Sequence, residues 1–223
     1  MSVRLLTRYG LTRTVGVGPP PAAGLWTDFS EYTLGTEPHD WTQTIRSGTW
    51  QVESGPFLRG QGGSSGERYA LVWDEIGDGA ETEDIELLVK TRASAHTTFR
   101  GCGVIMMHPD NGNSVHVYIA SNVIIVQRRR VNVYADVVTG ERSHAADTWY
   151  WLRVRVLSGV LSARSWEHGD SEPSTWNIDE VELDSNLVQP GHAGVFLRPN
   201  ASGTEYDWEF FSYAFGGDEA PSP

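Results

Sequence analysis

The sequence predicts an all-β fold, an antiparallel β-sandwich of the jelly-roll type, and three observations support it. Residues 149–156 alternate apolar side chains with Arg153 and Arg155, which is typical of a strand with one buried and one wet face. Ser158-Gly159 supplies a tight turn, and residues 161–166 alternate again on the return. Elsewhere, short apolar runs recur about every ten residues between turn signals, with no long helical pattern.

Turn residues divide the rest of the chain into strands. The segments 34–40, Ser47-Gly48 and Gly60–Gly66 are rich in turn formers, and Pro109-Asp-Asn-Gly-Asn is a hairpin signal. We therefore expect strands, in chain order, at residues 25–29, 41–45, 49–52, 69–73, 85–91, 103–108, 114–120, 123–128, 131–138, 149–156, 161–166, 178–183, 193–198 and 206–213.

The length of 223 residues suits a single sandwich, which we assign to residues 25–216. Residues 1–24 read as an extended N-terminal arm, because a basic apolar segment precedes the stiff run Pro19–Pro21. Such an arm either adds a strand to another subunit or packs on its own domain. Residues 217–223 read as an acidic flexible tail. The arm residues expected to contact a partner are Val3, Arg4, Leu5, Leu6, Arg8, Tyr9 and Arg13.

Charge and cysteine content exclude several classes of protein. A net charge of -12 argues against a nucleic-acid binder, and no apolar run is long enough for membrane insertion. The N-terminus lacks the apolar centre of a secretory signal peptide, so we expect folding in a reducing cytoplasm. A single cysteine, Cys102, leaves no internal disulfide, and we expect its thiol to be buried.

A set of motifs spread over residues 25–215 carries a resemblance to a known group. They are Trp149–Val156, Leu161–Trp166, Glu172-Pro173 with Trp176, Gly191–Phe196 and Tyr206–Tyr213, with Asp28–Tyr32, Trp41 and Asp84–Lys90 nearer the start. In this order they resemble the concanavalin A-like, laminin G-like jelly-roll domains found in bacteriophage virion proteins.

The resemblance implies a non-enzymatic structural protein of a tailed phage or phage-like particle, such as a head fibre, capsid decoration or tail-surface component. Such a protein assembles in the host cytoplasm and contacts other virion proteins. We expect residues 1–24 to anchor it and a symmetric homo-oligomer, a trimer for example, to form. The alternative is a carbohydrate-binding module that recognises host surface glycans, because one fold serves many functions.

Glycan binding would use exposed aromatic rings, whose faces stack on sugar rings. We select candidate rings in predicted strands and loops, although each of them could instead belong to the core or its rim. The candidates are Trp166, Trp176, Tyr118 and Tyr134, together with Trp73.

Catalytic and metal-binding patterns are weak. Glu81, Glu83 and Glu86 have the spacing of a laminarinase-type glycosidase strand, but the middle residue is not Asp and the intervening residues are polar. Calcium is a frequent companion of the fold, and the loop acids have no regular ligand spacing; they are Asp74, Asp78, Asp110 and Asp184. We therefore expect no catalytic residue, metal or cofactor. The run Arg128–Arg130 reads as a salt-bridged strand end or as a docking contact.

Overall fold

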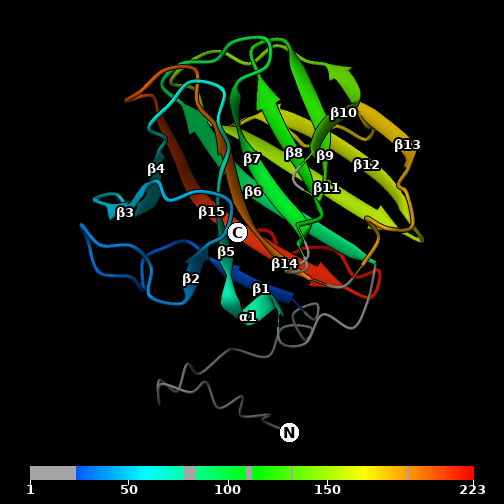
Figure 1. Ribbon diagram of the computed structural model, residues 1–223, viewed down its shortest axis with the longest axis horizontal. Coiled ribbons are helices and arrows are strands. Elements are labelled where there is room, and N and C mark those ends of the chain that lie inside the picture. Colours follow the sequence, from blue (N-terminus) through cyan, green and yellow to red (C-terminus); the bar gives the residue numbers. More distant parts are fainter. Residues whose placement is uncertain (1–23, 78–83, 109–111, 132, 190) are drawn as a thin grey trace, which may run out of the picture.

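The computed structural model describes residues 24–77, 84–108, 112–131, 133–189 and 191–223 (Figure 1). Within these ranges the chain is almost entirely β, and its one helix, α1 (Asp74–Gly77), has four residues. No helix in the described part of the chain has the length and hydropathy needed to cross a membrane. Of the predicted arm, residues 1–24, only Gly24 is described, and it begins β1; residues 1–23, with all the anchoring residues expected there, lie outside the described residues.

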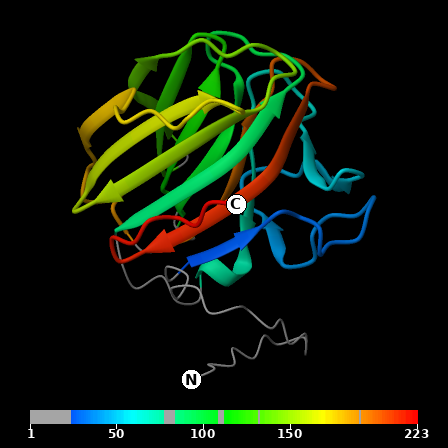
Figure 2. The ribbon, with the colours of Figure 1, turned by 180° about the vertical axis from the view of Figure 1, so that it is seen from behind.

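Two antiparallel sheets lie face to face (Figures 1 and 2). The eight-stranded sheet has the order β13 (Ile178–Glu182), β12 (Val160–Glu167), β11 (Tyr150–Leu157), β6 (Ile85–Ala93), β15 (Glu205–Phe215), β4 (Phe57–Gln61) and β3 (Thr49–Glu53), and β1 (Gly24–Thr27) also pairs with β15. The seven-stranded sheet has the order β10 (Val133–Glu141), β9 (Val123–Arg130), β8 (Ser114–Ala120), β7 (Gly101–His108), β14 (His192–Arg198), β5 (Tyr69–Trp73) and β2 (Trp41–Gln43).

The sheets bury one continuous core between them, as the alternating pattern predicts. Leu87 and Val154 from the eight-stranded sheet are fully buried there, as is Val117 from the other sheet. Trp208 is also fully buried, and its indole nitrogen donates a hydrogen bond of 3.1 Å to the carbonyl of Gly103. Because this donor is satisfied, a large polar-tipped side chain can occupy the centre of the sandwich without a desolvation penalty.

The predicted fold class is confirmed, and every predicted strand is present with ends that differ by a few residues. The strand β4 was not predicted, because Gly60 and the following glycine-serine loop resemble a turn in sequence. Gly60 is required by packing instead. A Cβ atom there would lie 2.6 Å from the Trp50 ring and 2.7 Å from Leu197.

Cys102 is buried, as predicted, and its side chain belongs to the core between the two sheets. The hydroxyl of Thr91 donates to its sulfur at 3.0 Å. Burial raises the pKa of this thiol to about 12, so it stays protonated and unreactive at neutral pH.

The C-terminal segment, predicted as a flexible tail, contacts the eight-stranded sheet at Ala220 and Pro221. Ala220 is only 2% exposed and packs on the outer face of the eight-stranded sheet. The hydroxyl of Ser212 donates a 2.7 Å hydrogen bond to the carbonyl of Pro221. The segment therefore has partners on the sheet, and its flexibility stays a prediction.

Two histidines meet in the loops beside β8 and β12. His144 is buried, with Nδ1 2.7 Å from the carbonyl of Ala120 and Nε2 2.8 Å from the hydroxyl of Ser165. The ring of His96 lies 6.4 Å from that of His144. Burial lowers the pKa of His144 to about 3 and that of His96 to about 4, so both rings are neutral at pH 7.

We expect the protein to lose stability as the pH falls from about 6.5 towards 4. In this window the unfolded histidines bind protons and the folded ones do not, so the free energy of unfolding decreases as protons are taken up. Urea unfolding at pH 7 and pH 5 measures this loss. The variant His144→Gln should have a smaller pH dependence than the wild type, whereas His168→Gln, at an exposed position, should match the wild type. An unchanged pH dependence in His144→Gln would contradict the assignment.

Candidate functional site

The predicted glycan-binding aromatics do not form one site. Trp166 and Trp176 lie on the outer face of the eight-stranded sheet, whereas Tyr118 and Tyr134 lie on the outer face of the seven-stranded sheet. Trp73 is in the core between the sheets, where it stacks on Trp41 at 5.5 Å. The two outer faces must therefore be considered separately.

On the seven-stranded sheet, the predicted tyrosines are engaged by arginines. Tyr118 is fully buried, and its hydroxyl accepts a 3.0 Å hydrogen bond from Arg198. Tyr134 is half-buried, and the guanidinium of Arg68 lies 3.7 Å from the centre of its ring. The expectation of an exposed ring is wrong for Tyr118, and Arg68 already covers part of Tyr134.

The outer face of the eight-stranded sheet carries an extended group of aromatic rings. We call the side chains of Trp26, Phe57, Trp149, Trp151, Trp166 and Phe210 the aromatic face. Along it, Trp26 stacks on Phe210 at 6.0 Å, Phe210 meets Trp151 at 5.8 Å, and Trp151 stacks on Trp166 at 6.3 Å. At the other end, Phe57 meets Trp149 at 6.3 Å.

The rings of the aromatic face differ in accessibility. Trp26 is 45% exposed, and Phe57, Trp149 and Trp151 are partly exposed. Phe210 and Trp166 are nearly buried at 3% and 5%. The expectation of an exposed ring is therefore wrong for Trp166, which packs beneath its neighbours, and its role in binding stays a prediction.

Charged side chains lie between these rings. The ammonium of Lys90 lies 5.5 Å from the ring of Trp149 and 5.8 Å from that of Trp151, and it is ion-paired with Glu209. The guanidinium of Arg92 lies 4.6 Å from Trp149. Hydrogen-bond donors and acceptors are therefore held beside the partly exposed rings, and cation–π contacts restrict their movement.

A second ion-paired group borders the same rings. Asp207 is buried and accepts hydrogen bonds from Arg59 at 2.8 Å and from Arg92 at 2.9 Å. Arg59 also lies 5.2 Å from the ring of Phe57. This carboxylate holds two guanidinium groups in place along one side of the aromatic face.

Trp176 lies near the aromatic face in the loop between β12 and β13. It is partly buried, with the guanidinium groups of Arg164 and Arg155 at 4.2 and 4.8 Å from its ring. Two cations next to one ring restrict the approach of a ligand, so its role in binding stays a prediction.

Arg153 is the main departure from the alternation that the sequence suggests. It lies on the outer face, as expected, but is only 1% exposed. Its guanidinium forms ion pairs with Glu86, with Glu172 at 2.7 Å and with Glu219 at 3.2 Å. Burial alone would lower the pKa of Arg153, but the carboxylates of Glu86 and Glu172 more than offset this and raise it.

This arrangement also bears on the weak glycosidase pattern. Glu86 is buried, ion-paired with Arg153, and hydrogen-bonded to the backbone nitrogen of Ala220 at 3.1 Å. These contacts explain Glu86 as part of the scaffold. Glu81 and Glu83 lie outside the described residues.

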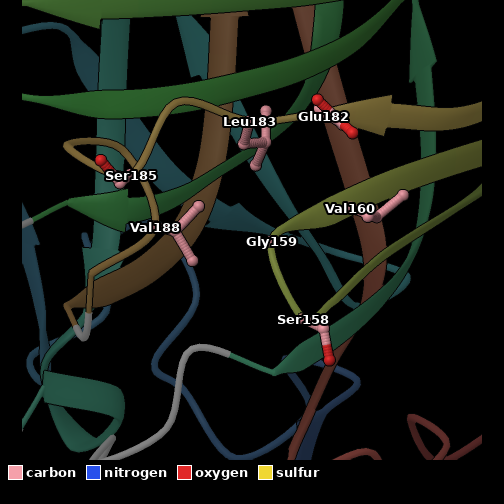
Figure 3. Close-up of a pocket in the computed structure, with 7 residues that line it drawn as sticks. All are labelled: Ser158, Gly159, Val160, Glu182, Leu183, Ser185 and Val188. Carbon is pink, nitrogen blue, oxygen red and sulfur yellow. The ribbon is translucent and has the colours of Figure 1, made fainter.

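A small cavity opens at one end of the sandwich, between the β11–β12 turn and the segment after β13 (Figure 3). Its volume is about 350 Å³. The lining residues combine hydroxyl, carboxylate and aliphatic groups; they are Ser158, Gly159, Val160, Glu182, Leu183, Ser185 and Val188. It lacks an aromatic ring, so we do not assign the candidate site to it.

The acids considered for calcium are not brought together. Asp184 forms an ion pair with Arg130, which agrees with a salt-bridged strand end for the arginine run. Asp74 begins α1, and Asp78 and Asp110 lie outside the described residues. Among the described side chains, no group of three or more His, Cys, Asp or Glu is placed to hold a metal ion.

The two sheets and their connections define a concanavalin A-like jelly-roll sandwich. The chain matches no family model and no curated protein sequence. Its fold is similar to the GH43 protein BlXynB from Bacillus licheniformis (17% identity, TM-score 0.61, 85% of this chain and 39% of that chain). It is also similar to a xylan beta-1,4-xylosidase from Bacillus halodurans C-125 (15%, 0.58, 92% and 41%).

A further match is the exoplasmic/lumenal domain of VIP36 in a Ca²⁺- and mannose-bound form (10% identity, TM-score 0.58, 90% of this chain and 96% of that chain). The chain spans about two fifths of the two Bacillus proteins. At these identities the similarity establishes the fold alone.

Most of the aromatic face was missed in the sequence, although a signal for part of it was present. Trp149 and Trp151 precede Arg153 and Arg155 at two-residue spacing. Residues at this spacing share one face of a strand, which places all four on the outer side. The contributions of Trp26, Phe57 and Phe210 depend on the pairing of β1 and β4 with β15, which the sequence did not reveal.

We expect Arg153→Ala to lower the free energy of unfolding by about 3–5 kcal/mol, because it leaves buried Glu86 without its cation. Chemical denaturation measures this change. The double variant Glu86→Gln, Arg153→Met should recover part of the loss, since it buries no unpaired charge. The control Arg155→Gln, at a partly exposed position on the same strand, should cost much less. Equal effects at Arg153 and Arg155 would refute the role of the buried ion pair.

Proposed function

We propose that this chain is a non-enzymatic carbohydrate-binding domain whose aromatic face stacks against the sugar rings of a glycan. The observation that carries the proposal is the row of partly exposed rings Trp26, Trp151 and Trp149 on an outer sheet face. Folding alone gives no reason for large rings to remain in contact with water at that position. Contiguous exposed apolar surface of this kind commonly marks a binding site.

The polar groups beside the rings suit the same ligand. A sugar presents an apolar ring face and a rim of hydroxyl groups, which need both donors and acceptors. Arg92, with 29% of its side chain exposed, offers N–H donors, and Glu209, with 37% of its side chain exposed, offers acceptors. Rings and polar groups within a few ångströms of one another meet both requirements.

The fold comparisons are compatible with this proposal. The similar structures include two proteins named for xylan or the GH43 class and one described as mannose-bound. Their sugars are not transferred to this chain, because the identities are 10–17%. They support a search among plant-type xylans and mannose-containing glycans first.

The virion hypothesis keeps its basis in sequence only. No similar structure reported above is a phage protein, and the arm expected to anchor the chain lies outside the described residues. Particle attachment, trimer formation, assembly in the host cytoplasm and contact with other virion proteins therefore remain predictions. A glycan-binding domain on a particle surface would satisfy both hypotheses.

A glycan array with the purified protein tests the proposal directly. Xylan and mannan oligosaccharides should be included beside host-surface glycans, and a confirmed ligand should then be titrated by calorimetry. Failure to bind any glycan at millimolar concentration would remove the proposed function.

Single substitutions locate the site on one outer face. We expect Trp26→Ala and Trp151→Ala each to weaken glycan binding about tenfold, since a lost ring contact is worth about 0.5–1.5 kcal/mol beyond its buried area. Tyr134→Ala removes a ring from the opposite outer face and is the matched control. If Tyr134→Ala abolished binding and the tryptophan variants did not, the site would belong to the seven-stranded sheet instead. Thermal unfolding of each variant verifies that the sandwich is intact.

A further inference from the structure

The C-terminal segment lies across the outer face of the eight-stranded sheet. After β15 the chain turns back, with the nitrogen of Gly216 donating to the carbonyl of Asp84 at 2.9 Å, and runs along the sheet (Figure 2). The nitrogen of Ala220 then donates to Glu86, and the carbonyl of Pro221 accepts from Ser212. We call residues 218–221 the strap.

The strap covers one side of the aromatic face. Ala220 belongs to a buried cluster with Leu88, Trp166, Phe210 and Ala214. Trp151, which is partly exposed, packs against the same cluster. The strap therefore lies on the rings that connect Trp26 to Trp151.

Pro221 extends this cover to β1. A Cβ atom at Gly24 would lie 2.9 Å from Cδ of Pro221, so the proline ring lies directly against the glycine backbone. Gly24 precedes Trp26 by two residues on the same strand and lies on the same side of the sheet. The strap thus crosses the sheet from the Arg153 cluster to the strand that bears the most exposed ring.

The contacts that hold the strap are few. Glu219 reaches Arg153 at 3.2 Å, but its side chain is 73% exposed, and ion pairs in contact with water contribute little. Besides this pair, the described contacts are two hydrogen bonds to the sheet, a 3.4 Å hydrogen bond from the nitrogen of Asp218 to the carbonyl of Phe215, the burial of Ala220, and the packing of Pro221 against Gly24. The conformational entropy lost on ordering each strap residue opposes these gains.

The sheet below the strap loses the hydrogen bonds of Glu86 to Ala220 and of Ser212 to Pro221 when the strap leaves, but it keeps its main ion pairs. Arg153 remains ion-paired with Glu86 and Glu172 when Glu219 leaves. Leu88, Phe210 and Trp166 would become accessible at that point, which would widen the aromatic face.

We propose that the strap is a detachable cover that competes with the glycan for the aromatic face. This proposal rests on the proposed function, which places the glycan on the rings that the strap covers. The glycan binds the open form, and the fraction of molecules in that form sets the apparent affinity.

Shortening the chain to end at Gly217 tests the competition. The dissociation constant of the glycan should fall in this variant, by a factor equal to the reciprocal of the open fraction in the full chain. This factor is about tenfold for a strap that is closed nine tenths of the time. Calorimetry or a binding titration against the full chain measures the ratio. Equal or weaker affinity in the shortened chain would overturn the proposal, because the strap would then be inert or part of the site.

A point substitution avoids removing any backbone. Glu219→Gln in the full chain keeps the side-chain size and weakens only the contact with Arg153, so it should produce a smaller gain in affinity. Glu141→Gln, an exposed carboxylate at the end of β10 in the other sheet, is the matched control and should leave affinity unchanged. An equal gain in both variants would reflect net charge and count against the strap.

A readout without glycan separates the two proposals. A peptide of residues 216–223, added to the shortened chain, should change its tryptophan fluorescence in a saturable manner, and the peptide with Glu219→Gln should bind more weakly. If no glycan binds either chain while the peptide does, the proposed function fails and the strap survives as a docked segment. If the peptide gives no saturable change, the strap is refuted whatever the glycan result.

Discussion

Every sheet has two faces, and in a two-layer sandwich only one face of each sheet meets the other. In this protein the two inner faces bury each other's apolar side chains, and Trp208, Leu87 and Val117 are fully buried there. The outer faces are left to be covered by side chains, by chain ends or by ligands. The groups that cover each outer face distinguish the structural part of this molecule from its candidate site.

The two outer faces are treated differently. On the seven-stranded sheet, arginines are placed over tyrosines, as with Arg198 at Tyr118 and Arg68 at Tyr134. On the eight-stranded sheet, one half is sealed by the buried charges around Arg153, and the other half keeps tryptophans in contact with water. Burial of a charge requires partners, and Arg153 has Glu86 and Glu172 besides Glu219 of the strap, so these ion pairs hold this half in place. The aromatic half has no such requirement and is free to exchange its cover.

Local patterns in the sequence were sufficient for the fold and insufficient for the site. Alternation along residues 149–156 correctly identified a strand, but it grouped Trp149 with Val154 and Val156, whereas Trp149 lies on the outer side. It could not reveal that Arg153 is buried, because its partners Glu86, Glu172 and Glu219 come from distant segments. For the same reason Tyr118 and Trp166 were mistaken for accessible rings. β4 was missed because Gly60, which makes room for Trp50, has the appearance of a turn residue.

The position of Cys102 has a practical consequence. It is the single cysteine of the chain, and its thiol is buried and remains protonated well above neutral pH. A second cysteine placed on the surface would thus be the one that reacts with a maleimide dye in the native protein, with no need to remove the first. One introduced at Ser222 would carry a fluorophore next to Pro221, which lies against Gly24 of β1. Opening and closing of the segment could then be followed one molecule at a time.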